Sequence, residues 1–96
     1  MNDHQLLCFL TVSRTLNFSS AARELYCTQP ALSYQIRSLE KELDVELFHR
    51  STTSVALTEA GRSFLPHAQN VYRHILNARN EVRPYARQKH LILNLP

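Results

Sequence analysis

A stripe of leucine and isoleucine between residues 28 and 43 constrains the fold of this chain most strongly. Its apolar residues recur at steps of four, three and four, so they share one face of a helix. They are Leu32, Ile36, Leu39 and Leu43. Thr28 is a good N-cap for this helix, and Pro30 falls in its first turn, where a missing N–H breaks no intrahelical hydrogen bond. The pattern predicts a helix with one buried face.

The opposite face of this helix is polar and net basic. It carries Gln29, Ser33, Tyr34, Arg37 and Lys41. Gln29, Ser33 and Arg37 lie nearly in one row, and such side chains can pair with base edges in the major groove of DNA. A polar helix face is more often merely solvated, by roughly four to one, so the neighbouring elements must decide.

Two helices are predicted before this one and a hairpin after it. Residues 3–14 have helical apolar spacing, and Ser19 can cap a short helix over residues 20–25. Residues 45–57 contain two short β-compatible runs around a polar tip at residues 51–53. The short helix, the tight turn and the capped helix match a helix-turn-helix, and the hairpin stands where a wing would.

A long helix is predicted from Thr58, which can cap it, with Glu59 at the positive end of the helix dipole. Apolar or small residues recur in it at steps of four and three, as in the seam of a coiled coil. We expect this seam, which Tyr85 extends, to pair two copies of the chain. The expected dimer residues are Phe64, Ala68, Val71, Ile75, Ala78 and Val82. Pro66 should bend the helix, and Pro84 should bend or end it.

Length and composition suit one soluble domain that can bind nucleic acid. The chain has 96 residues, 44% of them hydrophobic and 20% charged, and its net charge is +3. That charge only permits a nucleic-acid partner. No apolar run approaches the roughly 20 residues that cross a bilayer, and a secretory signal is missing. We therefore expect a cytoplasmic protein with no membrane partner.

Residues that could support metal or catalytic chemistry are poorly placed for it. The five histidines form no i, i+4 pair of the kind that holds a metal, and the single glycine excludes a Gly-rich phosphate loop. His49, beside Arg50, could contact phosphate. No nucleophile has a base beside it in the sequence. We expect no enzyme activity, no metal and no cofactor. Cys8 and Cys27 should both be reduced, and a redox role for Cys27 is the less favoured alternative.

Several segments follow one another in an order and spacing typical of one protein family. They are Asn17-Phe18-Ser19-Ser20-Ala21-Ala22, Thr28-Gln29-Pro30-Ala31-Leu32-Ser33, Leu39-Glu40, Leu47-Phe48 with Arg50, and Leu57-Thr58-Glu59-Ala60-Gly61. In these segments the chain resembles the N-terminal domains of LysR-type transcriptional regulators. The resemblance runs from Leu6 to about Ala68, roughly two thirds of the chain.

The resemblance implies a mostly α fold: a winged helix-turn-helix of three helices and a two-stranded wing over residues 1–58, then a linker helix over residues 59–88 that pairs two subunits. Residues 89–96 resemble the first strand of a missing effector-binding domain. The implied function is transcription regulation at an inverted-repeat promoter site in double-stranded DNA. A full-length protein would bind a small-molecule effector and could form a tetramer. We expect a fragment, and a naturally short regulator is the alternative.

The resemblance also places residues matching Gln29, Pro30 and Ser33 at the DNA surface, with Arg50 of the wing near the DNA backbone. Together with the polar helix face and the wing tip, it predicts a set of DNA-binding residues. They are Thr28, Gln29, Pro30, Ser33, Tyr34, Arg37, Arg50, Thr52 and Thr53.

Three positions depart from the family pattern. Tyr34 stands where relatives often have a basic residue, which leaves the base preference open. Asp44 replaces a common glycine but tolerates left-handed backbone, so we expect the turn to survive. The wing tip lacks a second arginine, so the helix should supply more of the affinity.

Two other functions are alternatives to DNA binding. A winged-helix protein–protein interaction module without its own DNA specificity would need an apolar third-helix face. A surface-active protein would need a long helix with a uniformly basic face, and this one mixes charges.

Overall fold

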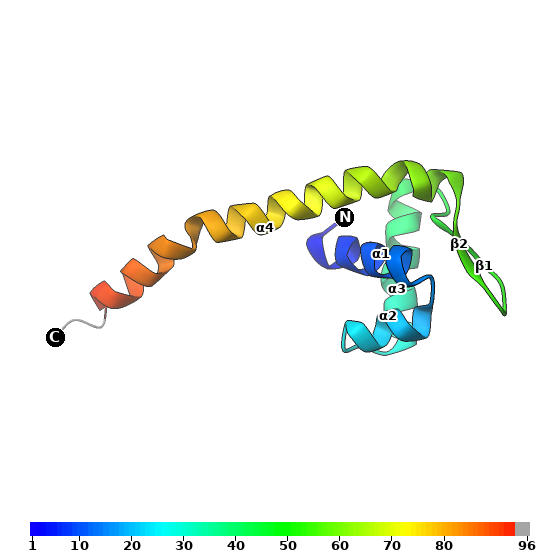
Figure 1. The fold of residues 1–96 in the computed structure, drawn as a ribbon, viewed down its shortest axis with the longest axis horizontal. Helices are drawn as coiled ribbons and strands as arrows, with labels where there is room; N and C mark the ends of the chain where they lie inside the picture. Colours follow the sequence, from blue (N-terminus) through cyan, green and yellow to red (C-terminus); the bar gives the residue numbers. More distant parts are fainter. Residues whose placement is uncertain (94–96) are drawn as a thin grey trace.

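The computed structural model describes the backbone of residues 1–93 and the side chains of residues 1–86. The elements are α1 (Asp3–Thr15), α2 (Phe18–Glu24), α3 (Gln29–Leu43), β1 (Phe48–Arg50), β2 (Val55–Leu57) and α4 (Glu59–Leu93). The first three helices gather in a bundle, the hairpin stands beside it, and α4 passes over α1 and continues far beyond it (Figure 1). The longest dimension is 61 Å. The predicted winged helix-turn-helix with a long fourth helix is confirmed.

Side-chain caps begin the first three helices. The Asn2 side chain accepts a hydrogen bond from the Gln5 N–H, and the Thr28 side chain accepts one from the Ala31 N–H at 3.2 Å. The prediction that Ser19 caps α2 is wrong, because Asn17 accepts the Ser20 N–H at 2.8 Å. A helix that begins this early includes Phe18, whose ring is thereby carried into the core.

Left-handed residues end two of the helices and form the turn between α2 and α3. Leu16, Tyr26 and Asp44 have φ of 51°, 54° and 56°. Leu16 and Asp44 are the C-caps of α1 and α3. The expectation that Asp44 would sustain the turn is confirmed.

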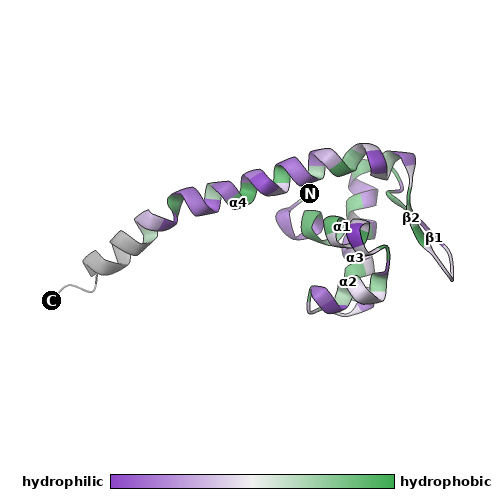
Figure 2. Cartoon of the chain, in the orientation of Figure 1, coloured by the Kyte–Doolittle hydropathy of each residue, from purple (hydrophilic) through white to green (hydrophobic). Residues whose placement is uncertain are grey.

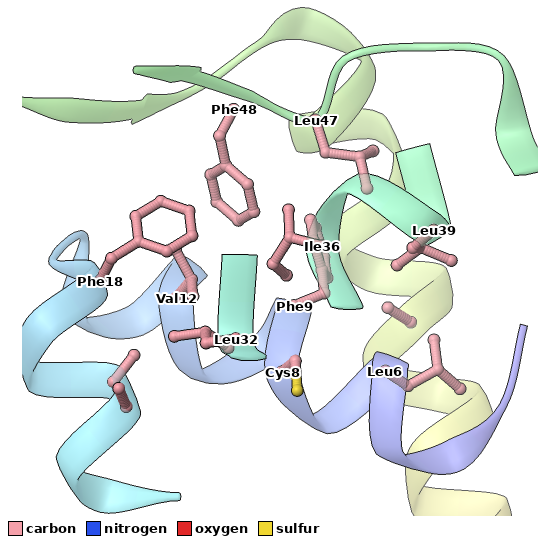
Figure 3. Close-up of a cluster of buried hydrophobic side chains, with 13 residues drawn as sticks. Leu6, Cys8, Phe9, Val12, Phe18, Leu32, Ile36, Leu39, Leu47 and Phe48 are labelled. Atoms are coloured by element: carbon pink, nitrogen blue, oxygen red, sulfur yellow. The ribbon is translucent and has the colours of Figure 1, made fainter. Parts of the chain in front are cut away.

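The apolar stripe of α3 lies in the core as predicted. Leu32, Ile36 and Leu39 are fully buried, and Leu43 packs against them at the edge. Figure 3 shows this stripe meeting side chains from α1, α2 and the start of the wing. Full burial of each such side chain contributes about 1.5–3 kcal/mol. The ring of Phe9 packs against Phe48 of the wing at a centroid separation of 5.4 Å. The bundle thus holds the wing beside α3.

The wing is a short antiparallel hairpin. Phe48 pairs with Leu57 and Arg50 pairs with Val55. Residues 51–54 form its tip, closed by a hydrogen bond of 2.9 Å from the Ser51 N–H to the Ser54 carbonyl. The predicted hairpin is confirmed, with Phe48 turned into the core and His49 exposed.

The start of α4 lies tightly against Glu46 and Leu47, the residues just before β1. Thr58 caps α4 as predicted, because its hydroxyl accepts the Gly61 N–H at 2.9 Å, and it also donates to the Glu46 carbonyl at 2.6 Å. A Cβ on Gly61 would lie 2.2 Å from the Leu47 carbonyl oxygen. Glycine is therefore required at this close approach.

Part of the seam predicted for a partner is used inside the chain. Ala68 is 1% exposed, and Phe64 and Ile75 pack against the same core. The first turns of α4 lie against α1 and turn this side towards the bundle, and a role of these three residues in a dimer interface stays a prediction. Val71, Ala78 and Val82 are exposed on the described surface.

The end of α4 also differs from expectation. The helix continues through both Pro66 and Pro84. Its orange to red part takes a steeper course than the rest in Figure 1. The strand expected over residues 89–96 is wrong for its first part, because α4 extends to Leu93. A helix satisfies its own backbone groups, whereas a lone strand cannot. Residues 94–96 lie outside the described part.

Candidate nucleic-acid interface

The row on the outer face of α3 is positioned by the buried stripe behind it. Gln29 and Arg37 are exposed, and Ser33 is half-buried between them. With Pro30 they line a shallow depression on the surface. Because Leu32 and Ile36 fix the rotation of α3, the row is held outward.

A cleft of about 300 Å³ separates this row from the wing. Six of the nine predicted DNA-binding residues line it: Gln29, Ser33, Arg37, Arg50, Thr52 and Thr53. Residues 16–19, at the start of α2, and Ser51, Ser54 and Val55 of the wing complete the lining. Outside this cleft are Pro30, Thr28 with its capping hydroxyl, and Tyr34, which is 67% exposed.

Arg50 is more constrained than a free wing arginine. Its Nη2 lies 3.1 Å from Oε1 of Glu40, and its guanidinium carbon lies 4.7 Å from the centre of the Phe18 ring. Its side chain is only 24% exposed. A planar guanidinium suits such simultaneous pairing and stacking. Its charge is therefore paired with that of Glu40, which lies outside the lining of the cleft.

Glu40 joins α3 to the wing, and sequence reasoning assigned it no role. Its Oε2 accepts hydrogen bonds from the N–H groups of Leu47 and Phe48 at 2.7 and 3.4 Å, while Oε1 pairs with Arg50. These hydrogen bonds join residues seven to ten positions apart in the sequence. The periodicity of a helix or a strand therefore does not predict them. Only the resemblance singled out this residue.

Ser19 is a second residue whose role the sequence did not reveal. Its hydroxyl donates a hydrogen bond of 2.9 Å to Oε1 of Gln29, which is ten positions away. Both side chains line the cleft. The bond links the start of α2 to the first residue of α3.

Other chemistry finds little support in the described residues. They contain no group of three or more His, Cys, Asp or Glu side chains placed to hold a metal ion. No helix among them is long and apolar enough to cross a membrane. Cys8 is buried, and burial raises the pKa of its thiol to about 11, while Cys27 is half-buried. Thiols are unreactive when they stay protonated, which disfavours redox chemistry at Cys8.

An outward polar helix after a tight turn, with a hairpin beside it, defines the winged helix-turn-helix class. The chain belongs to the lysR family of bacterial regulatory helix-turn-helix proteins, whose family model matches residues 4–62.

Relatives agree with this assignment. The chain is 45% identical over 82 residues to the HTH-type transcriptional regulator HdfR of Salmonella typhimurium, a match that covers 85% of this chain and 30% of HdfR. The chain thus spans under a third of the length of the curated relatives it matches.

Solved structures agree as well. The CbnR domain in its complex with DNA has a TM-score of 0.83 and 32% identity, with 90% of this chain and 99% of that chain covered. The BenM domain in a complex with catB site 1 DNA has a TM-score of 0.83 and 30% identity, with 90% and 97% covered.

Proposed function

We propose that the chain binds double-stranded DNA sequence-specifically as a homodimer and serves as the DNA-binding part of a cytoplasmic transcription regulator. The cleft that brings Gln29, Ser33 and Arg37 beside the wing carries this proposal. Side chains of these kinds read base edges in the major groove. The CbnR and BenM structures, which contain DNA, support it.

The exposed part of α4 supports the dimer. Val71 and Val82 are apolar and largely exposed, and Ala78 lies between them on the same helix. Two copies joined along α4 would present two recognition helices, which suits an inverted-repeat site. A longer protein containing this chain would add an effector-binding domain for a small molecule and could form a tetramer.

The surface of α3 argues against a protein-contact module. Gln29, Arg37 and Lys41 are exposed there, whereas a protein-binding face would offer a contiguous apolar patch. This polar and basic composition suits a phosphate-lined groove.

Selection of bound sequences from a random duplex pool tests the proposal, followed by titration of the selected site and a scrambled duplex at two salt concentrations. We expect an inverted repeat, preferred by on the order of a thousandfold. Gln29→Ala should relax one base position and cost about 1–3 kcal/mol. Gln35→Ala, on the same helix but outside the cleft, is the control. Weak binding without enrichment that disappears at higher salt would contradict sequence recognition.

A further inference from the structure

Ser19 lies at the start of α2 and reaches across the helix-turn-helix to Gln29. Its hydroxyl is exposed and donates to Gln29 Oε1 at 2.9 Å. The Asn17 side chain caps α2, so the Ser19 hydroxyl does not act as the N-cap of this helix. Within the described residues, the side-chain hydrogen bond of Ser19 is the one to Gln29.

In the structure this hydrogen bond joins Ser19 to the oxygen end of the Gln29 amide. A glutamine amide has an acceptor end, the oxygen, and a donor end, the NH₂ group. With its oxygen on the Ser19 hydroxyl, the amide has its NH₂ end directed away from that hydroxyl in the structure. Within the described part of the chain, Nε2 of Gln29 has no hydrogen-bond partner, and the side chain lines the cleft beside the wing.

The two ends of the amide favour different bases. Purine N7, guanine O6 and thymine O4 accept hydrogen bonds in the major groove, whereas the cytosine N4 amino group donates one. An amide held with its NH₂ outward suits an acceptor edge. An unrestrained amide can turn over and offer its oxygen to cytosine.

We propose that Ser19 is a specificity-determining residue that acts through Gln29: it holds the amide with its donor end towards the DNA and so disfavours cytosine at the base position that Gln29 reads. The inference rests on the proposed function, in which Gln29 faces a base. Ser19 itself belongs to α2, outside the recognition helix.

Selection from the random duplex pool with four chains tests this: the native chain, Ser19→Ala, Gln29→Ala and the double variant. Ser19→Ala should raise the share of cytosine, relative to the other bases, by about two- to fivefold at the position that Gln29→Ala alters, as expected for one exposed hydrogen bond. In the Gln29→Ala background, removal of the Ser19 hydroxyl should have no further effect on base preference.

Matched variants separate the hydrogen bond from the shape of the side chain. Ser19→Thr keeps a hydroxyl and should keep the native preference, whereas Ser19→Val has nearly the same shape without it and should behave as Ser19→Ala does. Ser20→Ala removes the next hydroxyl of α2, which does not touch Gln29, and should leave the preference unchanged. Circular dichroism confirms that each variant is folded.

The possible failures are distinguishable. If Gln29→Ala alters one base position and Ser19→Ala does not, Ser19 does not determine specificity, although the proposed function stands. A uniform loss of affinity for all sequences in Ser19→Ala would assign Ser19 to a phosphate contact and overturn the inference. If Gln29→Ala alters no position, the proposed base contact itself fails.

Discussion

Tyr26 has an unfavourable backbone conformation in the turn between α2 and α3. Its φ is 54° and the residue is 97% exposed, so little packing compensates. A left-handed conformation costs an L-residue about 1–2 kcal/mol, and glycine avoids most of that cost. We expect Tyr26→Gly to raise the free energy of unfolding by about 0.5–1 kcal/mol, because the greater freedom of glycine in the unfolded chain offsets part of the gain. Urea denaturation followed by circular dichroism measures this.

The control for this prediction is another exposed tyrosine. Tyr34 lies within α3, where glycine is unfavourable, so Tyr34→Gly should lower the free energy of unfolding by about 1 kcal/mol. Opposite signs for the two variants would support the backbone argument. A loss of stability in both would show that the Tyr26 side chain makes a stabilising contact.

Cys8 makes stability depend on alkaline pH. Burial raises the pKa of its thiol from 9.0 to about 11. Above pH 9 the unfolded chain therefore loses this proton more readily than the folded chain, and stability falls as pH rises towards 11. At pH 10.5 we expect the native chain to have lost about 2 kcal/mol relative to pH 8 beyond any loss in Cys8→Ala. Urea denaturation of both chains at the two pH values checks this, and parallel losses would refute it.

At the scale of elements, Glu40 connects α3 to the wing. Glu40→Ala would leave the Arg50 guanidinium and the N–H groups of Leu47 and Phe48 without this acceptor. We expect a loss of about 2–3 kcal/mol in the free energy of unfolding. Glu40→Gln keeps one oxygen and should lose less. Thermal unfolding followed by circular dichroism provides the comparison.

Glu42 is the matched control for Glu40. It pairs with the N-terminal amine at the surface, where an ion pair contributes about 0–1 kcal/mol. Glu42→Ala should therefore change the melting temperature little. Similar losses for both variants would mean that Glu40 acts only as one more surface charge.

The elements themselves could be predicted because their signals are local. The stripe of α3, the Thr28 cap and the Thr58 cap depend on spacings of a few residues, and the structure has all of them. Local signals can still be misplaced, since Asn17 rather than Ser19 caps α2. The strand expected at Lys89 failed because apolar residues in a short run do not distinguish strand from helix.

The candidate site could be predicted as a row of residues but not as a set of contacts. The row on α3 follows from helical spacing, and the cleft contains it. The hydrogen-bond partners of Gln29 and Arg50 depend on how α2 and the wing pack against α3. The spacing of residues along the sequence does not reveal this packing. Ser19 and Glu40 were therefore missed as positioning residues.

At the scale of the whole molecule, α4 divides into two parts with different roles. Its first turns pack on the bundle, and its apolar side there belongs to the core of this chain. Arg79 ties the helix to the start of α1 through a contact of 2.5 Å with Asp3. Beyond the bundle, Figure 2 shows bands of hydrophobic and hydrophilic colour along α4. A heptad repeat gave the same signal for both parts, because folding and dimer formation bury helix faces alike.

The two parts of α4 should respond differently to the same substitution. Val82 is 59% exposed, so Val82→Asp should leave the domain folded while placing a charge in the proposed seam. Ala68 is 1% exposed, so Ala68→Asp should unfold the domain instead. Light scattering gives the mass and circular dichroism the folded state. Asn80→Asp adds the same charge to an exposed position nearby and should leave the mass unchanged.

The affinity of the Val82→Asp variant for DNA tests the proposed seam a second time. A monomeric Val82→Asp variant should lose most of its affinity for the inverted repeat, because the two recognition helices no longer bind as one unit. Its affinity for a single half-site should remain close to that of the native chain. A dimeric mass for Val82→Asp would remove Val82 from the seam. A monomeric variant with unchanged affinity for the inverted repeat would show that each copy binds its half-site independently, so that pairing along α4 would contribute nothing to recognition.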